Sequence, residues 1–479
     1  MRDPRGVRIG AACRAAFYAL LVGFAVGAPL WLAALDTPFI HTSPSRSFAV
    51  HQLVGFTGAL AALAIAGLEV RRRRSSSLQA LLPILLPLLL ILHFLQRIWA
   101  AALRPWDYDV YEYAARVVLR GADPYSAGVG YIYPPLTAQA LAAAYRGAAR
   151  LQALIGLETD GEAVWLDVFY LHQCSQLVLV LAAYFLCQRF ARALGLGGLW
   201  AHGLGFALLI ANDALYETLW HGQVNLWLLD SSLAGLLLAR RAPALGGLAL
   251  AIGAHIKLYP LAMLWPLLVS RCARAMLWTG VAVFALALLQ SDLGRDWTLF
   301  RQFLAHFTGT SYLQLAPQNN SLQSILWNFA RMTSGGAVRL PPALLGGLSA
   351  AWVALAGGWL LLRTLARLRE RRAGPPDPCW DRRLLLAGGA EALAFGLLVS
   401  PTVWPHEYLM AVPLAILAAA LRGRERPVAV AAGILLVMGT PNFGIFPLSY
   451  RCTAGILMLL GLTRPGAAPL RAPAGLERQ

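Results

Sequence analysis

The sequence predicts an all-α polytopic membrane protein, a bundle of about 14 transmembrane helices, since a bilayer-crossing helix needs roughly 20 apolar residues. Three observations support this fold class. Hydrophobic residues make up 58% of the 479 positions and charged residues only 13%. Mean hydropathy is +0.59, far above that of an ordinary globular protein. Apolar runs also alternate with short loops that are rich in arginine.

The apolar runs divide the chain into two parts. Residues 1–78 contain two N-terminal spans and an arginine-rich loop, and residues 79–470 contain the remaining spans. The predicted spans lie near residues 15–35, 50–70, 79–102, 163–187, 198–215, 224–239, 244–257, 259–270, 275–291, 342–364, 383–400, 408–421, 427–441 and 449–463.

The arginines predict the orientation of these spans. The loop with Arg71–Arg74 is expected to be cytoplasmic, because basic residues collect in cytoplasmic loops. Counting from there, every later inside loop carries arginine, both termini are cytoplasmic, and loops 104–162 and 292–320 are outside. The net charge of +17 therefore reflects membrane topology and does not indicate nucleic-acid binding.

The stretch 104–136 is the longest polar interruption in the first half of the chain. It places Asp107, Asp109, Glu112 and Asp123 among seven Trp and Tyr residues. Carboxylates between aromatic rings suit an acid–base site for a sugar or another flat polar ligand. The alternative is an interfacial helix, with its aromatic rings at headgroup depth and its acids in water. The following segment, Ala138–Ala153, has the pattern of an amphipathic helix.

Lys257 is the single lysine among the 40 basic residues. It lies at the end of an apolar span, just before Pro260, which cannot continue a helix without losing a backbone hydrogen bond. A lysine at this place either extends its ammonium group to the interface or pairs with an anion such as a lipid phosphate.

Three further segments at predicted outer ends carry candidate binding groups. His406 follows Pro401 and Pro405 and could hydrogen-bond a phosphate or a sugar, or be an ordinary interfacial histidine. The segment 216–225 includes Gln223 and Asn225 and could equally be a tight loop. The segment 318–324 includes Asn319 and Ser321 and could equally cap a helix.

Several chemistries have no support in the sequence. The six cysteines are scattered without metal-type spacing, and no nucleotide-binding or nucleophile-elbow motif stands where it could work. We therefore expect no cofactor and no divalent metal, and a substrate that arrives already activated by a lipid.

Together these segments resemble a known family. WDYDVYEYAARVVLRGADPY followed by YIYPPL is similar to the first outer loop of glycosyltransferase family 87, the polyprenyl-phosphate-mannose-dependent mannosyltransferases of the GT-C superfamily. HGQVNLWLL, GGLALAIGAHIKLYPLAMLWPLL, NNSLQSIL and SPTVWPHEY follow in the family's order. The chain departs from the family in its two extra N-terminal helices and in Asn319-Asn320-Ser321, which stands where the family has an NQS-like element.

The resemblance implies a GT-C-like transmembrane catalytic module over residues 79–470, with amphipathic helices in its first outer loop. It also implies an inverting transfer of a mannosyl or related residue from a polyprenyl-phosphate sugar to a glycolipid or glycan acceptor. Asp107 is then the catalytic base, with Asp109 as its rival two residues away. The substrate-binding candidates are Asp109, Tyr111, Tyr133, Gln223, Asn225, Lys257, Asn319, Ser321 and His406.

The alternative function is a multi-pass transporter or flippase of a lipid-linked sugar. The sequence shows no clear internal repeat, and its polar groups gather at one face instead of the midplane, which favours the enzyme. Abundant Ala, Leu, Gly and Arg suggest a G+C-rich bacterial genome. We therefore expect a protein of the bacterial cytoplasmic membrane that contacts membrane lipids and faces outward with its site.

The predicted orientation can be tested with single cysteines at positions 128 and 374, in a background without native cysteines. In intact cells an impermeant thiol reagent should label position 128, in the first outer loop, and spare position 374, in an inside loop. Labelling of 374 without 128 would reverse the topology.

Overall fold

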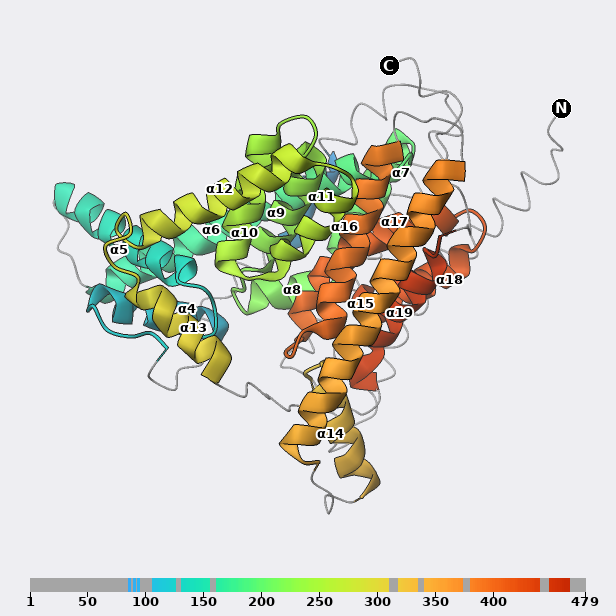
Figure 1. The fold of residues 1–479 in the computed structure, drawn as a ribbon. Helices are drawn as coiled ribbons and strands as arrows, with labels where there is room; N and C mark the ends of the chain where they lie inside the picture. The colour runs from blue at the N-terminus through green and yellow to red at the C-terminus, as the bar shows by residue number, and fades with distance from the viewer. Residues whose placement is uncertain are drawn as a thin grey trace, which may run out of the picture. The chain divides into compact units, whose positions relative to one another are not determined.

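The computed structural model describes residues 106–125, 131–155, 161–309, 318–334, 340–373, 380–439 and 448–465, with a few residues between 85 and 94. Every regular element in this part of the chain is helical (Figure 1), so the all-α prediction is confirmed there. The predicted spans near 15–35 and 50–70 and the loop Arg71–Arg74 lie outside the described residues.

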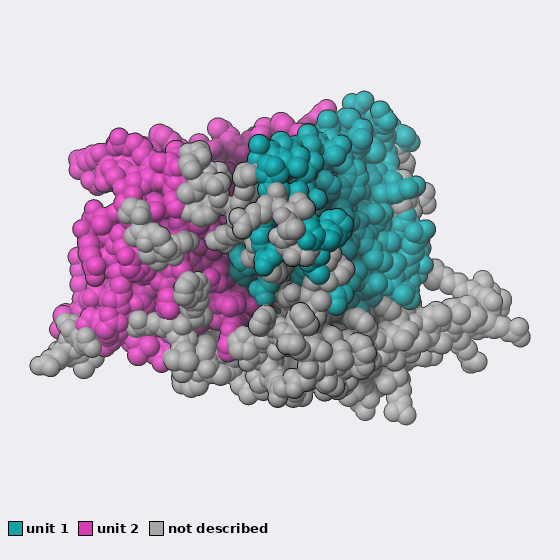
Figure 2. Space-filling model, turned by 90° about the horizontal axis from the view of Figure 1, so that it is seen from below, with its two compact units in different colours: residues 1–90, 187–214, 313–479 teal, residues 91–186, 215–312 magenta. Residues whose placement is uncertain are grey.

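The chain forms two compact units, which Figure 2 colours separately. Unit 1 combines residues 1–90, 187–214 and 313–479, and unit 2 combines residues 91–186 and 215–312. Among the elements given a range here, α6 (Gly161–Ala193) and α8 (Asp213–Trp220) each begin in one unit and end in the other.

Unit 2 contains most of α6 and α8 and the segment predicted as the first outer loop. Its other elements are α4 (Trp106–Leu119), α5 (Leu136–Leu154), α9 (Asn225–Leu238), α10 (Pro243–Ile256), the 3-10 helix η1 (Tyr259–Met263), α11 (Leu264–Val269), α12 (Ala273–Gln290) and α13 (Thr298–Gly309).

Unit 1 contains the later helices. They are α7 (Gly198–Ile210), α14 (Leu322–Thr333), α15 (Pro342–Ala373), α16 (Trp380–Val399), the 3-10 helix η2 (Pro405–Ala411), α17 (Val412–Arg422), α18 (Pro427–Ile434), the π turn η3 (Leu435–Gly439), the 3-10 turn η4 (Leu448–Tyr450) and α19 (Arg451–Leu462).

Three of the described helices are long and apolar enough to cross a membrane: Gly161–Ala193, Ala273–Gln290 and Ala343–Ala373. Most of the other predicted spans from residue 198 onward are helical where expected, but as shorter or broken helices. The span predicted at 198–215 ends at Ile210, and α8 begins at Asp213. α15 continues to Ala373, into the loop predicted at 365–382, and α13 interrupts the polar segment 292–320. The predicted total of about 14 spans stays a prediction.

Unit 2 is built around α10, which packs between α9 and α12 (Figure 1). A Cβ atom at Gly247 would come within 2.6 Å of the Thr279 backbone nitrogen, so only glycine allows α10 and α12 to approach this closely. Small residues serve the same purpose where membrane helices pack together.

The end of α10 follows from the proline four residues later. The Pro260 ring would clash with the Ile256 carbonyl in a continuing helix. Accordingly α10 ends at Ile256, and Lys257 has extended backbone angles of φ −158° and ψ 144°. The predicted break is confirmed, and it begins at Lys257.

Unit 1 is fastened by a buried ion cluster. Arg363 and Arg367 on α15 each donate to the same Glu391 oxygen on α16, at 2.6 Å. Both arginines also donate to groups at the end of α19: Arg363 to the Leu460 carbonyl, at 2.8 Å, and Arg367 to the Thr463 carbonyl, at 2.9 Å. The three charged side chains are at most 5% exposed, so the cluster ties α15, α16 and α19 together away from water.

Glu391→Ala should destabilise the protein by about 3–5 kcal/mol, because it leaves two guanidinium groups buried without their carboxylate. Thermal unfolding in detergent would measure the loss. Arg295→Ala is the matched control, because it removes a cation from the exposed Asp292–Arg295 pair and should change stability little. Equal stability of the two variants would contradict a structural role for the cluster.

Candidate functional site

Five tyrosine side chains of the predicted first outer loop pack inside unit 2. Tyr108, Tyr111, Tyr125, Tyr131 and Tyr133 are all buried, with at most 7% of their surface exposed. Only Tyr113, at 40%, is exposed among the loop's described tyrosines. Five of these rings are therefore packed within the protein and are not exposed at its surface.

The segment between α4 and α5 is shaped by its own side chains. The Asp123 carboxylate accepts from the Tyr125 backbone N–H, at 2.8 Å, and the Tyr125 hydroxyl donates to the Tyr133 carbonyl, at 2.9 Å. The Tyr131 hydroxyl donates to the Pro134 carbonyl, at 2.9 Å, just before α5 begins. These bonds fix the position of Tyr133 beside α4.

Gln223 joins the loop to the membrane helices. Its side-chain oxygen accepts from the Tyr111 hydroxyl at 2.6 Å and from the Tyr133 hydroxyl at 3.2 Å. Burial, together with the nearby Tyr133 and Asp107 side chains, raises the pKa of Tyr111 well above its ordinary value, so Tyr111 stays a donor. With its oxygen held by two hydroxyls, the Gln223 amide keeps its NH₂ group as its donor.

Helix α6 holds the turn that carries Gln223. The His172 ring Nε2 lies 2.9 Å from the Gly222 carbonyl, and the Gln176 amide donates to the Gln223 carbonyl at 2.9 Å. Gly222 takes a positive φ of 63° in this turn. Asn225, also buried, is the first residue of α9 directly after the turn.

Asp107 lies in the first turn of α4 and faces His221. Its carboxylate oxygen is 3.7 Å from His221 Nδ1, and the other ring nitrogen, Nε2, is 2.9 Å from the Glu217 carboxylate. The Asp107 side chain is 26% exposed, so it can be reached from outside the cluster. Tyr111 follows four residues later on the same face of α4.

Asp109 points away from this cluster. Two residues along a helix correspond to a rotation of about 200°. α4 is helical from Trp106, and Asp109 is exposed whereas Asp107 is half-buried. Asp107, and not Asp109, therefore shares a side of the helix with Tyr111.

Lys257 lies beside the rings of Tyr133 and Tyr259. Its ammonium nitrogen is 5.4 Å from the centre of the Tyr133 ring and 5.6 Å from that of Tyr259, both within cation–π range. Tyr111, Gln223, Tyr133 and Lys257 thus form one continuous group of contacts in unit 2, and Asp107 is near enough to Tyr111 to raise its pKa. We call these five residues the outer cluster, after the position that the sequence predicts for them.

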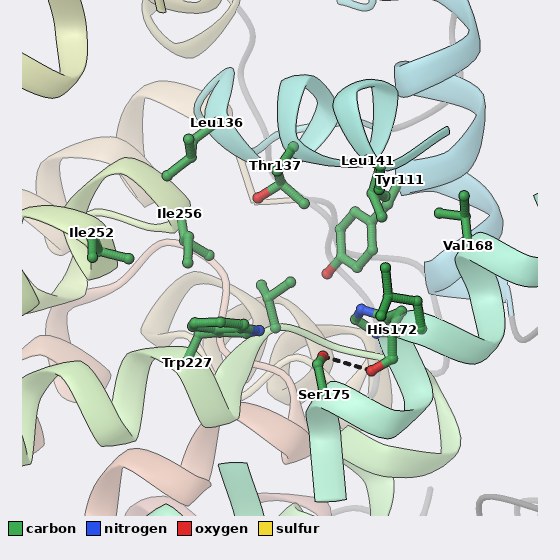
Figure 3. Close-up of a pocket in the computed structure, with 14 residues that line it drawn as sticks. Tyr111, Leu136, Thr137, Leu141, Val168, His172, Ser175, Trp227, Ile252 and Ile256 are labelled. Carbon is green, nitrogen blue, oxygen red and sulfur yellow. Dashed lines mark hydrogen bonds between the residues drawn. The ribbon is translucent and has the colours of Figure 1, made fainter. Parts of the chain in front are cut away.

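A cavity of about 280 Å³ adjoins the outer cluster (Figure 3). The Tyr111 ring projects into it, and Trp227, Ile252 and Ile256 lie across from that ring. Its wall is almost wholly apolar, and no Arg, Lys, Asp or Glu contributes to it. The remaining lining residues are Leu136, Thr137, Ala140, Leu141, Ala144, Val168, Leu171, His172, Ser175 and Val224.

The other three predicted site residues belong to unit 1. The Asn319 side-chain oxygen accepts from the Ser321 N–H at 3.0 Å and from the Val403 N–H at 2.9 Å, which fastens two segments of unit 1. Ser321 caps α14 by accepting from the Ser324 N–H, as the helix-cap alternative predicts. His406 is buried in η2, directly after Pro405.

The sequence analysis did not identify the residues that hold the candidate site in place. His172 and Gln176 lie four residues apart on α6, inside an apolar span where polar groups are costly, and this spacing was an available signal. His221 and Glu217 have the same spacing, but nothing in the sequence shows that they meet Asp107, which is more than 100 residues away.

These features describe a helical membrane protein with a cluster of polar side chains beside an apolar cavity, and comparisons with known proteins identify its family. The sequence model of glycosyltransferase family 87 matches residues 131–401, more than half of the chain. The chain belongs to glycosyltransferase family 87. Asp107 precedes the matched range.

Two curated relatives carry the same description: polyprenol-phosphate-mannose-dependent alpha-(1-2)-phosphatidylinositol mannoside mannosyltransferase. The chain is 34% identical to the one from Mycobacterium tuberculosis and 30% identical to the one from Mycolicibacterium smegmatis, in each case over 229 residues. That stretch is 46% of this chain and 48% of each relative, so the chain spans about half the length of the curated relatives it matches.

Proposed function

We propose that the protein transfers a mannosyl residue from a polyprenyl-phosphate sugar to a hydroxyl of a glycolipid or glycan acceptor. The observation that carries this proposal is the outer cluster, in which an accessible carboxylate, an amide donor and an ammonium group surround two buried tyrosines. Membership of glycosyltransferase family 87 and the donor named for both relatives support it over a transporter of the same lipid.

Asp107 is the general base in this proposal. As the acceptor oxygen bonds to the anomeric carbon of the sugar, Asp107 takes the hydroxyl proton, and the bond from that carbon to the phosphate oxygen breaks. The polyprenyl phosphate leaves as an anion, so the step requires no general acid. Attack opposite the leaving group inverts the configuration, and a β-linked donor gives an α-linked product.

Lys257 and Gln223 are proposed to bind the polar end of the donor. An ammonium group placed where negative charge develops stabilises the leaving phosphate in the transition state. The extended backbone at Lys257 brings its side chain over Tyr133, whose hydroxyl in turn orients Gln223. Donor phosphate at Lys257 and sugar hydroxyls at Gln223 are consistent with these contacts.

The apolar cavity is suited to hydrocarbon. Ile256 lines it and Lys257 follows directly in the chain, so a lipid whose phosphate met Lys257 could extend along the cavity wall. Ligand pockets usually measure about 300–1,000 Å³, so this cavity would take only a short part of a polyprenyl chain.

The remaining candidates have supporting roles in this proposal. Tyr111, Tyr133 and Asn225 shape the sugar site, and Asp109 contributes charge at its edge. Asn319 and Ser321 would act by fixing the segment that they bond in unit 1, and a substrate contact by His406 stays a prediction from the sequence. The site is proposed to face outward from a bacterial cytoplasmic membrane, where the donor is a substrate and no cofactor or divalent metal takes part.

Asp107→Asn should lower transfer by about a hundred- to ten-thousandfold, because the amide keeps the size of the side chain but cannot accept the proton. Asp109→Asn is the matched control and should keep a measurable rate, since Asp109 faces away from Tyr111. Transfer from radiolabelled polyprenyl-phosphate mannose in membranes measures both. The opposite ranking would move the base to Asp109, and full activity of both variants would remove the proposed mechanism.

Lys257→Ala should reduce turnover with the same donor by about ten- to a hundredfold, as expected when a charge-assisted phosphate contact of about 1.5–3 kcal/mol is lost. Arg295→Ala removes an exposed cation from the same unit and should leave turnover unchanged. Unaltered kinetics of Lys257→Ala would show that this lysine only extends to the interface.

A further inference from the structure

His221 and Glu217 have no part in the proposed transfer, although both lie beside its base. Glu217 is on α8, and His221 follows four residues later in the turn before α9. The imidazole ring stands between two carboxylates: Nε2 is 2.9 Å from Glu217, and Nδ1 is 3.7 Å from Asp107. All three side chains belong to unit 2.

The two contacts of His221 differ in kind. At 2.9 Å the contact with Glu217 is a hydrogen bond, in which Nε2–H donates to the carboxylate. Because Glu217 is only 12% exposed and the ring 33%, this bond holds the imidazole in one orientation. The contact with Asp107, at 3.7 Å, is within ion-pair range and leaves the carboxylate room for a second partner.

The surroundings of His221 favour its charged form. Burial alone would lower its pKa, but the hydrogen bond and charge of Glu217 on α8, with the charge of Asp107 on α4, hold the pKa of His221 above its ordinary value. From α6, the neighbouring His172 ring is directed at the Gly222 carbonyl. The two carboxyl groups therefore favour the imidazolium form of the ring that lies between them.

We propose that His221, held in place by its hydrogen bond to Glu217, is a positioning residue that orients the Asp107 carboxylate toward the acceptor hydroxyl. This inference rests on the proposed function. The ion pair occupies one Asp107 oxygen, which leaves the other to take the acceptor's proton. Without this charge the partly exposed carboxylate could rotate freely, and fewer encounters would meet the geometry that proton transfer requires.

Every proton and electron pair in the proposed transfer is accounted for. The acceptor's proton ends on Asp107, the polyprenyl phosphate takes the bonding electrons, and His221 keeps both of its protons throughout. Asp107 then returns its proton to water, which its partly exposed side chain can reach.

The first test is the pH dependence of kcat, measured with labelled polyprenyl-phosphate mannose and membrane acceptor. The wild-type rate should hold at pH values where His221 is charged and fall as the ring loses its proton. Glu217→Gln keeps a hydrogen-bond acceptor but removes the anion that raises the pKa of His221, so this alkaline decline should move to lower pH. A profile that superimposes on the wild type would overturn the proposal.

The second test separates positioning from folding. His221→Gln should lower kcat about ten- to a hundredfold, leave KM nearly unchanged because His221 touches no substrate, and abolish the alkaline decline. Glu162→Gln is the control, because it removes an exposed carboxylate of the same unit that pairs with Arg116. Thermal unfolding shows whether His221→Gln folds. If it does not fold, the pH profile of kcat for Glu217→Gln tests the positioning role by itself. Wild-type kcat in His221→Gln would contradict the inference.

Failure here is distinguishable from failure of the proposed function. If Asp107→Asn is inactive while His221→Gln and Glu217→Gln behave as wild type, Asp107 remains the base and only the positioning role is lost. If Asp107→Asn is fully active, the proposed mechanism and this inference fail together.

Discussion

The candidate site depends on one amide oxygen, that of Gln223, which accepts two tyrosine hydroxyls at once. Tyr111 brings α4 to this point and Tyr133 brings the segment before α5, while α6 holds the turn from the other side through the Gly222 and Gln223 carbonyls. A buried hydroxyl left without a partner costs about 1–3 kcal/mol. The predicted outer loop is therefore held to the turn before α9, and through that turn to α6, by hydrogen bonds that the buried surroundings make costly to break.

Much of the described fold could be predicted from the sequence, because hydropathy follows directly from the bilayer as a solvent. The helices from α9 to α12 lie within a few residues of their predicted spans, and Pro260 accounts for the break at Lys257. The predicted helix ends differ from the observed ones where a change in hydropathy does not mark the end of a helix. α15 runs into an arginine-rich segment because Arg363 and Arg367 are bonded to Glu391, a partner more than 20 residues away.

The sequence identified the residues of the candidate site but not how they are arranged in space. The motif identified Asp107, Tyr111, Tyr133, Gln223 and Lys257, and unit 2 brings these five into one group. The spacing of Asp107 and Asp109 implies opposite faces of a helix, yet it cannot say which face is the inner one. That choice depends on where the turn at 221–223 lies, and long-range packing decides it.

The tyrosines show why residue type alone left two interpretations open. A tyrosine combines an apolar ring with one polar tip, so it suits the membrane interface and a buried polar network equally well. In this loop the hydroxyls of Tyr111, Tyr125, Tyr131 and Tyr133 all donate to protein oxygens, which is the second use. The Tyr111 and Tyr133 rings contact each other, Asp107 lies one helical turn before Tyr111 on α4, and the Lys257 ammonium group lies over the Tyr133 ring. Rigid neutral donors thus separate the group that would accept a proton from the group that would bind a phosphate.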